Sequence, residues 1–61
     1  MDFSKIEKLM TDNKISAYQL SKKIGIPASS ITAWKKGKYN PGVNSIKKIA
    51  EYFGVTVDYF L

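Results

Sequence analysis

The side chains of this sequence that could take part in chemistry are lysines, hydroxyls and amides. The chain contains ten lysines and no arginine, and its five acidic residues leave a net charge of +5. No acid occurs between Asp12 and Glu51, whereas this interval contains Lys14, Lys22, Lys23, Lys35, Lys36, Lys38, Lys47 and Lys48. A field of one sign steers a polyanion toward the molecule, and nucleic acid is the leading candidate. The alternative is that these lysines only solvate helix faces.

Several classes of protein are not expected from this composition. The chain has no histidine or cysteine, and its five carboxylates form no pair on a common helix face. We therefore expect neither an enzyme nor a bound metal or other cofactor. The longest apolar run is far shorter than the roughly 18 residues that suggest a membrane span, and the N-terminus lacks a secretory signal. With 61 residues the chain is expected to form one domain, 1–61, in the cytoplasm.

Apolar residues recur at helical spacing in four segments of the chain. We expect a helix over residues 2–12, a second that begins after Ser16, a third over about 27–36 and a fourth over about 44–53. After the fourth helix, Thr56 can cap a last short turn, in which the residues that pack inward are Val57 and Phe60 or Leu61.

The second and third of these helices are joined by a short turn. Ser16 and Gln19 have the spacing of a capping box. Gly25 closes the second helix, and Pro27 suits the first position of the next because its missing N–H would have no intrahelical partner there. Gly37 is predicted to stop the third helix in the left-handed conformation. Two short helices joined by a three-residue turn with glycine are typical of a helix-turn-helix, here at about 16–37.

The third helix has an outward face of small side chains. Because Ile31 and Trp34 lie three residues apart, both are predicted to face the core, and Trp34 is not expected to stack on bases. The outward side then carries Ala28, Ser29, Thr32, Ala33 and Lys36. Such a face lets the helix approach the floor of a DNA major groove closely, so these five are the predicted base-reading residues. For Lys36 a phosphate contact is the alternative.

Residues that could hold the DNA backbone lie at helix starts and in the loop after the third helix. Exposed N–H groups and the helix dipole favour an anion at a helix start. The loop adds an ammonium, a hydroxyl and an amide. The predicted backbone set is Ser16, Ala17, Tyr18, Lys38, Tyr39, Asn40 and Asn44. Tyr39 could instead pack over the ring of Pro41.

The whole chain resembles the Cro/C1-type helix-turn-helix family, which includes the phage lambda repressor. The resemblance is carried by ISAYQLSKKIGIPASSITAWKKGKYNPGVNSIKKIAEYFGVTVDYFL. It implies an all-α fold, a compact four- to five-helix lambda-repressor-like domain that binds a double-stranded DNA operator as a homodimer. Its implied function is transcriptional regulation, by a phage-type repressor or the N-terminal DNA-binding domain of one, in a bacterial or phage-infected cell. No membrane and no small-molecule ligand are expected.

The chain departs from the family's pattern at several positions. Ala17, Ala28 and Ala33 stand where the family often has polar residues, so much of the usual base recognition is absent. Gly42 stands where serine commonly caps the fourth helix, and Ser21 stands where alanine is usual, with a hydroxyl that can bond back to a helix carbonyl.

Two questions of assembly and function stay open at this point. Because the sequence shows no evident apolar patch for dimerisation, we expect the isolated domain to be a monomer that pairs mainly on DNA. The alternative function is a helix-turn-helix that binds an acidic protein, such as an antitoxin or adaptor.

Overall fold

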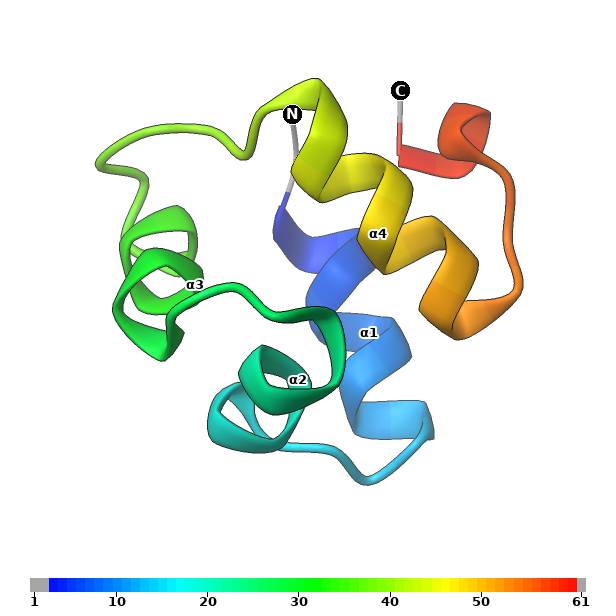
Figure 1. Ribbon diagram of the computed structural model, residues 1–61, viewed down its shortest axis with the longest axis horizontal. Coiled ribbons are helices and arrows are strands. Elements are labelled where there is room, and N and C mark those ends of the chain that lie inside the picture. Colours follow the sequence, from blue (N-terminus) through cyan, green and yellow to red (C-terminus); the bar gives the residue numbers. More distant parts are fainter. Residues whose placement is uncertain (1–2, 61) are drawn as a thin grey trace.

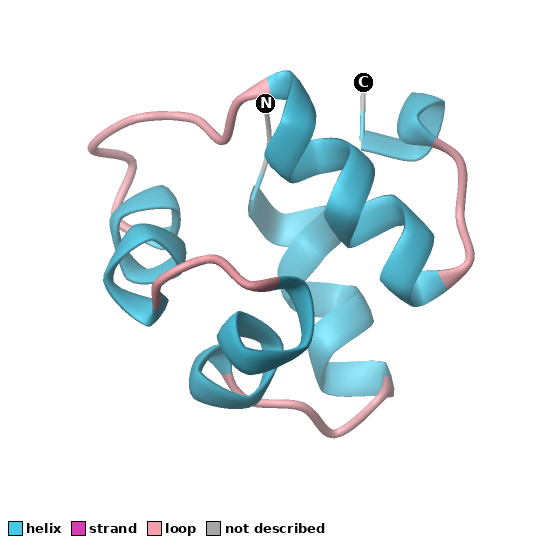
Figure 2. Cartoon of the chain, viewed as in Figure 1, coloured by secondary structure: helices cyan, strands magenta, loops and turns pink. Residues whose placement is uncertain are grey.

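The computed structural model describes residues 3–60 as five short helical elements (Figure 1). In chain order they are α1 (Phe3–Asp12), α2 (Ala17–Ile24), α3 (Ala28–Lys35), α4 (Val43–Phe53) and the 3-10 helix η1 (Val57–Phe60). Within these residues there is no strand, and Figure 2 shows helices joined only by loops. The all-α architecture is therefore confirmed. The predicted helix start at Asp2 and packing role of Leu61 lie outside the described residues.

The five helical elements pack closely against one another. Figure 1 shows α2 and α3 toward one edge of the molecule, α4 across its centre and η1 near the opposite edge. α2 packs against both α3 and α4, and α4 packs against η1. The principal extents are 24 × 22 × 19 Å. None of the helices in residues 3–60 combines the length and the apolar character needed to cross a bilayer.

One hydrophobic core joins all five elements. Its nine buried side chains are Ile6 of α1, Leu20 and Ile24 of α2, Ile31 and Trp34 of α3, Ile46, Ile49 and Ala50 of α4, and Phe60 of η1. All are apolar, and no polar or charged residue of the described chain is buried. Burying a large apolar side chain contributes roughly 1.5–3 kcal/mol, so each short helix is held mainly by this shared core.

The start of α2 has the predicted capping box. The Ser16 hydroxyl accepts from the Gln19 N–H at 3.2 Å, and the Gln19 side-chain oxygen accepts from the Ser16 N–H at 2.9 Å. Two N–H groups that would otherwise lack partners are thus satisfied. The Ser21 hydroxyl donates to the Tyr18 carbonyl at 2.7 Å, which confirms the predicted bond back to the helix.

All four α-helices end in the same hydrogen-bonded turn. In each, the N–H of a residue two or three positions past the helical end donates to a carbonyl five positions back, as Lys38 does to Ala33 at 3.0 Å and Ile15 does to Met10 at 2.9 Å. The residue before that donor has a positive φ. After α2, α3 and α4 it is glycine, with φ of 72°, 77° and 72° at Gly25, Gly37 and Gly54. After α1 it is Lys14, with φ of 54°.

Three helix boundaries differ from the sequence prediction by one residue. Pro27 precedes α3 as its N-cap instead of opening it, because its ψ of 140° is extended and its carbonyl accepts from the Ser30 N–H at 3.0 Å. Lys36 is the C-cap rather than the last helical residue. α4 begins at Val43, with Gly42 as an extended N-cap that lacks a side-chain hydrogen bond.

Candidate nucleic-acid interface

The core fixes which face of α3 points outward. Ile31 and Trp34 are only 1% and 5% exposed, as predicted for the inward face. Of the five predicted base-reading residues, three are exposed and two are half-buried: Ser29, Thr32 and Lys36, then Ala28 and Ala33. The accessible side of α3 is therefore built from small side chains with two hydroxyls, and a long cationic side chain follows at its end.

The turn after α3 carries part of the predicted backbone set. The Gly37 N–H donates to the Trp34 carbonyl at 3.1 Å and the Lys38 N–H to the Ala33 carbonyl at 3.0 Å. These two bonds fix the direction in which the loop leaves the helix. Lys38, Tyr39 and Asn40 follow as exposed residues, with Tyr39 53% exposed. Asn44 is likewise exposed, in the first turn of α4.

The start of α2 carries the rest of that set. Ser16 and Tyr18 are exposed, and Ala17 is half-buried. The ammonium of Lys22 lies 4.7 Å from the centroid of the Tyr18 ring, one helical turn further along α2. The exposed ring of Tyr18 is therefore flanked by a cation of its own helix.

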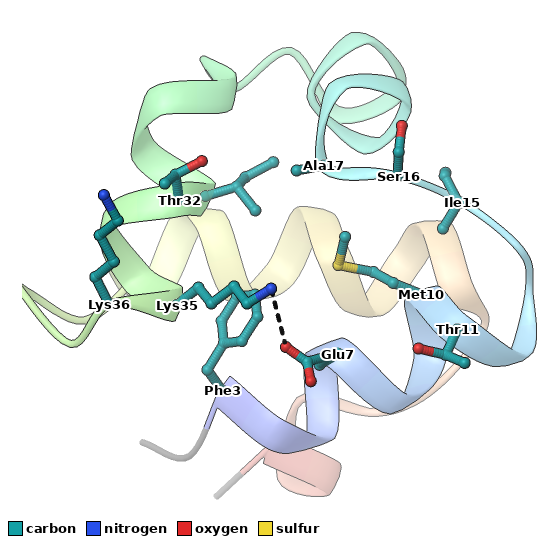
Figure 3. A pocket seen from close by; sticks show the side chains of 11 residues that line it. Phe3, Glu7, Met10, Thr11, Ile15, Ser16, Ala17, Thr32, Lys35 and Lys36 are labelled. Carbon is teal, nitrogen blue, oxygen red and sulfur yellow. Dashed lines mark ion pairs between the residues drawn. The ribbon is translucent and has the colours of Figure 1, made fainter.

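A groove brings members of both predicted sets together. It has a volume of about 780 Å³ and lies between α1, the start of α2 and α3 (Figure 3). Ser16 and Ala17 line it from the start of α2, and Thr32 and Lys36 line it from α3 and its C-cap. Half-buried apolar side chains complete its wall, among them Phe3, Met10 and Ile15. Residues far apart in the sequence thus share one surface.

The same groove contains two charged residues that the sequence did not assign to the site, Glu7 and Lys35. The Lys35 ammonium lies 3.7 Å from a Glu7 carboxylate oxygen, and Figure 3 shows Lys35 reaching across the groove while Lys36 extends away from it. The side chains are 66% and 53% exposed, so the pair contributes less than about 1 kcal/mol. No sequence signal links residues of two helices so far apart in the chain.

Six of the eight lysines of the acid-free interval divide between two surfaces. Lys36 and Lys38 accompany α3 and its loop, whereas Lys14, Lys22, Lys23 and Lys48 line hollows next to Tyr52. In the described part of the chain, no group of three or more His, Cys, Asp or Glu residues could hold a metal ion. The charged groups at the candidate site are its lysines and the Glu7 carboxylate, together with the partial charges of the helix ends.

The known proteins that this chain resembles are named as HTH-type transcriptional activators or regulators. A family model described as helix-turn-helix matches residues 6–60. The HTH-type transcriptional activator BcrR of Enterococcus faecalis is 32% identical over 62 residues, which cover 100% of this chain and 30% of BcrR. An uncharacterized HTH-type transcriptional regulator of Methanocaldococcus jannaschii is 37% identical over 46 residues, covering 75% of this chain and 70% of that protein.

A third relative is also a helix-turn-helix regulator. An uncharacterized HTH-type transcriptional regulator of Haemophilus influenzae is 37% identical over 41 residues, 67% of this chain and 17% of that protein. This chain therefore spans less than a third of both the Enterococcus and the Haemophilus relatives. No solved structure matches the chain significantly.

Proposed function

Because the chain belongs to the Cro/C1-type helix-turn-helix family of transcriptional regulators, we propose that it binds double-stranded DNA sequence-specifically, with α3 in the major groove. The observation that carries this proposal is the outward face of α3. Its small exposed side chains oppose Ile31 and Trp34, which anchor the helix in the core. A helix with such a face can approach base edges without a steric barrier.

The proposed base contacts come from the five predicted base-reading residues, which form the reading set: Ala28, Ser29, Thr32, Ala33 and Lys36. The hydroxyls of Ser29 and Thr32 can donate to or accept from base edges, and the methyl groups of Ala28, Thr32 and Ala33 can touch a thymine methyl. Each of these contacts is weaker than a bidentate one. Lys36 reaches a guanine edge or a phosphate from the end of α3.

The proposed backbone contacts flank α3 on both sides. On one side are Ser16, Ala17 and Tyr18 at the start of α2, and on the other the residues Lys38, Tyr39, Asn40 and Asn44. Phosphate contacts from both sides would fix the register of α3 on the duplex.

We further propose that the domain acts as a homodimer on its operator, with a monomeric state in the absence of DNA. Its largest extent is 24 Å. Half-sites one helical turn apart are separated by about 34 Å, so each domain would cover one half-site. The specific role proposed is that of a phage-type repressor or its N-terminal DNA-binding domain, acting in the cytoplasm where the operator is located.

The test begins with binding sites selected from a pool of random duplexes, followed by fluorescence anisotropy at several salt concentrations. Affinity for the selected site should fall steeply with salt, because neutralised phosphates release counterions. Thr32→Ala and Ser29→Ala should each lower discrimination at one or two base pairs by about 1 kcal/mol. Lys38→Ala should weaken binding to all sequences alike and reduce the salt slope by about 1.

A matched control and two outcomes decide the test. Lys8→Ala removes an exposed lysine of α1 that does not line the groove, and it should change affinity far less than Lys38→Ala. If affinity for the selected site did not change with salt, we would abandon DNA binding in favour of a protein-binding helix-turn-helix. Equal losses on selected and random duplexes for Ser29→Ala and Thr32→Ala would remove both residues from the reading set.

A further inference from the structure

A second basic surface lies around Tyr52, formed by two adjoining hollows. Their volumes are about 430 and 340 Å³, and Lys23 and Tyr52 line both. We call this region the Tyr52 surface and define it by Lys14, Ile15, Lys22, Lys23, Lys48 and Tyr52. Its residues come from the loop after α1, from the last turn of α2 and from α4.

The charge on the Tyr52 surface is largely uncompensated. Its four lysines face one carboxylate, that of Glu51, which lines the smaller hollow. Within residues 3–60 none of the four lysines forms an ion pair, and Lys22 has the Tyr18 ring as its aromatic neighbour at 4.7 Å. Positive charge without internal partners is complementary to an anionic partner.

The same surface also offers an apolar contact. The Tyr52 side chain is 42% exposed, and its ring packs edge-on against Phe53, with the centroids 5.0 Å apart. Ile15 is half-buried and lines the larger hollow next to Tyr52. An aromatic or aliphatic side chain of a partner could therefore enter between lysines.

The position of the Tyr52 surface separates it from the proposed reading face. In Figure 1, α3 lies at the left edge, whereas the C-terminal end of α4 and the end of α1 lie at the lower right. A duplex along the outward face of α3 would leave the part of the Tyr52 surface on α4 uncovered, whereas Ile15 also lines the groove beside α3 and Lys22 lies next to Tyr18. The lysines of this surface are thus not explained by base or phosphate contacts of α3.

We propose that the Tyr52 surface binds an acidic protein segment that carries an aromatic or aliphatic side chain. Nucleic acid fits it less well, because α2 and α4 both end here and neither presents its free N-terminal N–H groups to a phosphate. Carboxylates are reached by the long lysine side chains, and the hollow beside Tyr52 and Ile15 takes the apolar group. This inference goes beyond DNA binding and does not depend on it.

The experiment is a pair of NMR titrations of the ¹⁵N-labelled protein. One uses a peptide with a repeating Asp-Phe-Glu-Leu sequence, and the other uses a random duplex. The peptide is expected to bind saturably and to shift the amides of residues 14–15, 22–24 and 48–52, while the duplex shifts those of 16–18, 28–40 and 44. A peptide with Lys in place of Asp and Glu should not bind, because it would be repelled by the four lysines.

Two variants and one control test the named residues by peptide anisotropy. Lys48→Glu and Tyr52→Ala should each weaken peptide binding about tenfold. Lys8→Glu makes the same charge change on α1, outside both hollows, and should alter binding less than about twofold. Unfolding curves check that each variant is folded, and Lys48→Glu changes an exposed side chain without removing a core group.

The outcomes separate this inference from the proposed function. Absence of saturable peptide binding, shifts centred on α3, or equal losses in Lys48→Glu and Lys8→Glu would each overturn the inference. So would a duplex that shifts residues 48–52 more than the acidic peptide does. Failure of the duplex to bind anywhere would overturn the DNA-binding proposal alone. The peptide titration would still test whether the Tyr52 surface binds an acidic segment.

Discussion

Replacing Lys14 by glycine should stabilise this domain, although the change deletes a side chain. Lys14 has a φ of 54° and occupies the left-handed position that Gly25, Gly37 and Gly54 fill after the other three α-helices. The hydrogen bonds at this turn are complete, with the Lys14 N–H donating to Thr11 at 3.1 Å. The substitution therefore keeps every backbone bond and removes only the Cβ that disfavours this conformation.

The expected gain follows from two opposing terms. A residue with a Cβ loses about 1–2 kcal/mol in the left-handed region. Glycine loses about 0.5–1 kcal/mol more backbone entropy on folding than a residue with a side chain. The Lys14 side chain is exposed and forms no ion pair within residues 3–60, so its removal adds little. The net gain is about 0.5–1 kcal/mol, equivalent to roughly 4–8 °C in Tm for a domain of this size.

Urea denaturation followed by circular dichroism measures this gain, with two control variants. Lys14→Ala removes the same charge but keeps a Cβ, and its stability should stay close to that of the parent. Gly25→Ala adds a Cβ at φ 72°, where no heavy atom lies within 4 Å, so any loss reflects the backbone conformation alone. This loss should be about 0.5–1 kcal/mol.

One result would refute the reasoning. If Lys14→Gly were no more stable than Lys14→Ala, the left-handed backbone at Lys14 would not be a source of strain. A gain shared by both variants would instead point to relief of repulsion among neighbouring lysines, and raising the salt concentration would abolish it.

Three further predictions use other features of the fold. Gly42→Ser should stabilise by about 0.5–1 kcal/mol, because a hydroxyl can cap α4 at a compatible φ of −75°; urea titration without a gain would contradict this. Glu7→Gln should raise affinity for duplex DNA about two- to threefold at low salt by freeing Lys35, and anisotropy at high salt should show no difference. Trp34→Phe should destabilise by less than about 1 kcal/mol, since it removes a buried indole N–H without a partner; a loss as large as that of Ile31→Ala, about 2–5 kcal/mol, would refute this.

The local signals in the sequence predicted most of the fold because the interactions behind them are local. Ser16 and Gln19 are three residues apart, so their reciprocal capping bonds could be predicted from spacing alone. Gly37 could be assigned a left-handed conformation because it is a glycine directly after a predicted helix. The three-residue spacing of Ile31 and Trp34 predicted the inward face of α3, and with it the composition of the outward face.

The sequence did not predict which of two neighbouring residues adopts the left-handed conformation after α1. At the end of α1, asparagine tolerates a left-handed conformation better than lysine does, yet Lys14 adopts it. Asn13, the first residue after α1, keeps a right-handed backbone, and its backbone N–H and side-chain amide both donate to the Leu9 carbonyl, at 3.0 and 2.7 Å. The turn therefore falls one residue later than composition favours.

The surfaces that join distant segments had no sequence signal at all. The ion pair of Glu7 and Lys35 depends on how α1 packs beside α3. The Tyr52 surface requires the loop after α1, the end of α2 and α4 to meet. In the sequence, its lysines and those near α3 form one acid-free interval, and only the tertiary structure separates them into two groups. The roles of both groups in binding stay predictions.

The burial of Trp34 has a practical consequence for spectroscopy. It is the single tryptophan of the chain, it lies on the inner side of α3, and its indole N–H has no hydrogen-bond partner in the structure. Its fluorescence should therefore have the blue-shifted maximum of an indole in apolar surroundings and should move to the red on unfolding. Since the ring is shielded from any ligand on the outer side of α3, docking of a duplex without rearrangement would leave the emission unquenched. A change in Trp34 emission on binding would thus report movement of α3 relative to the core.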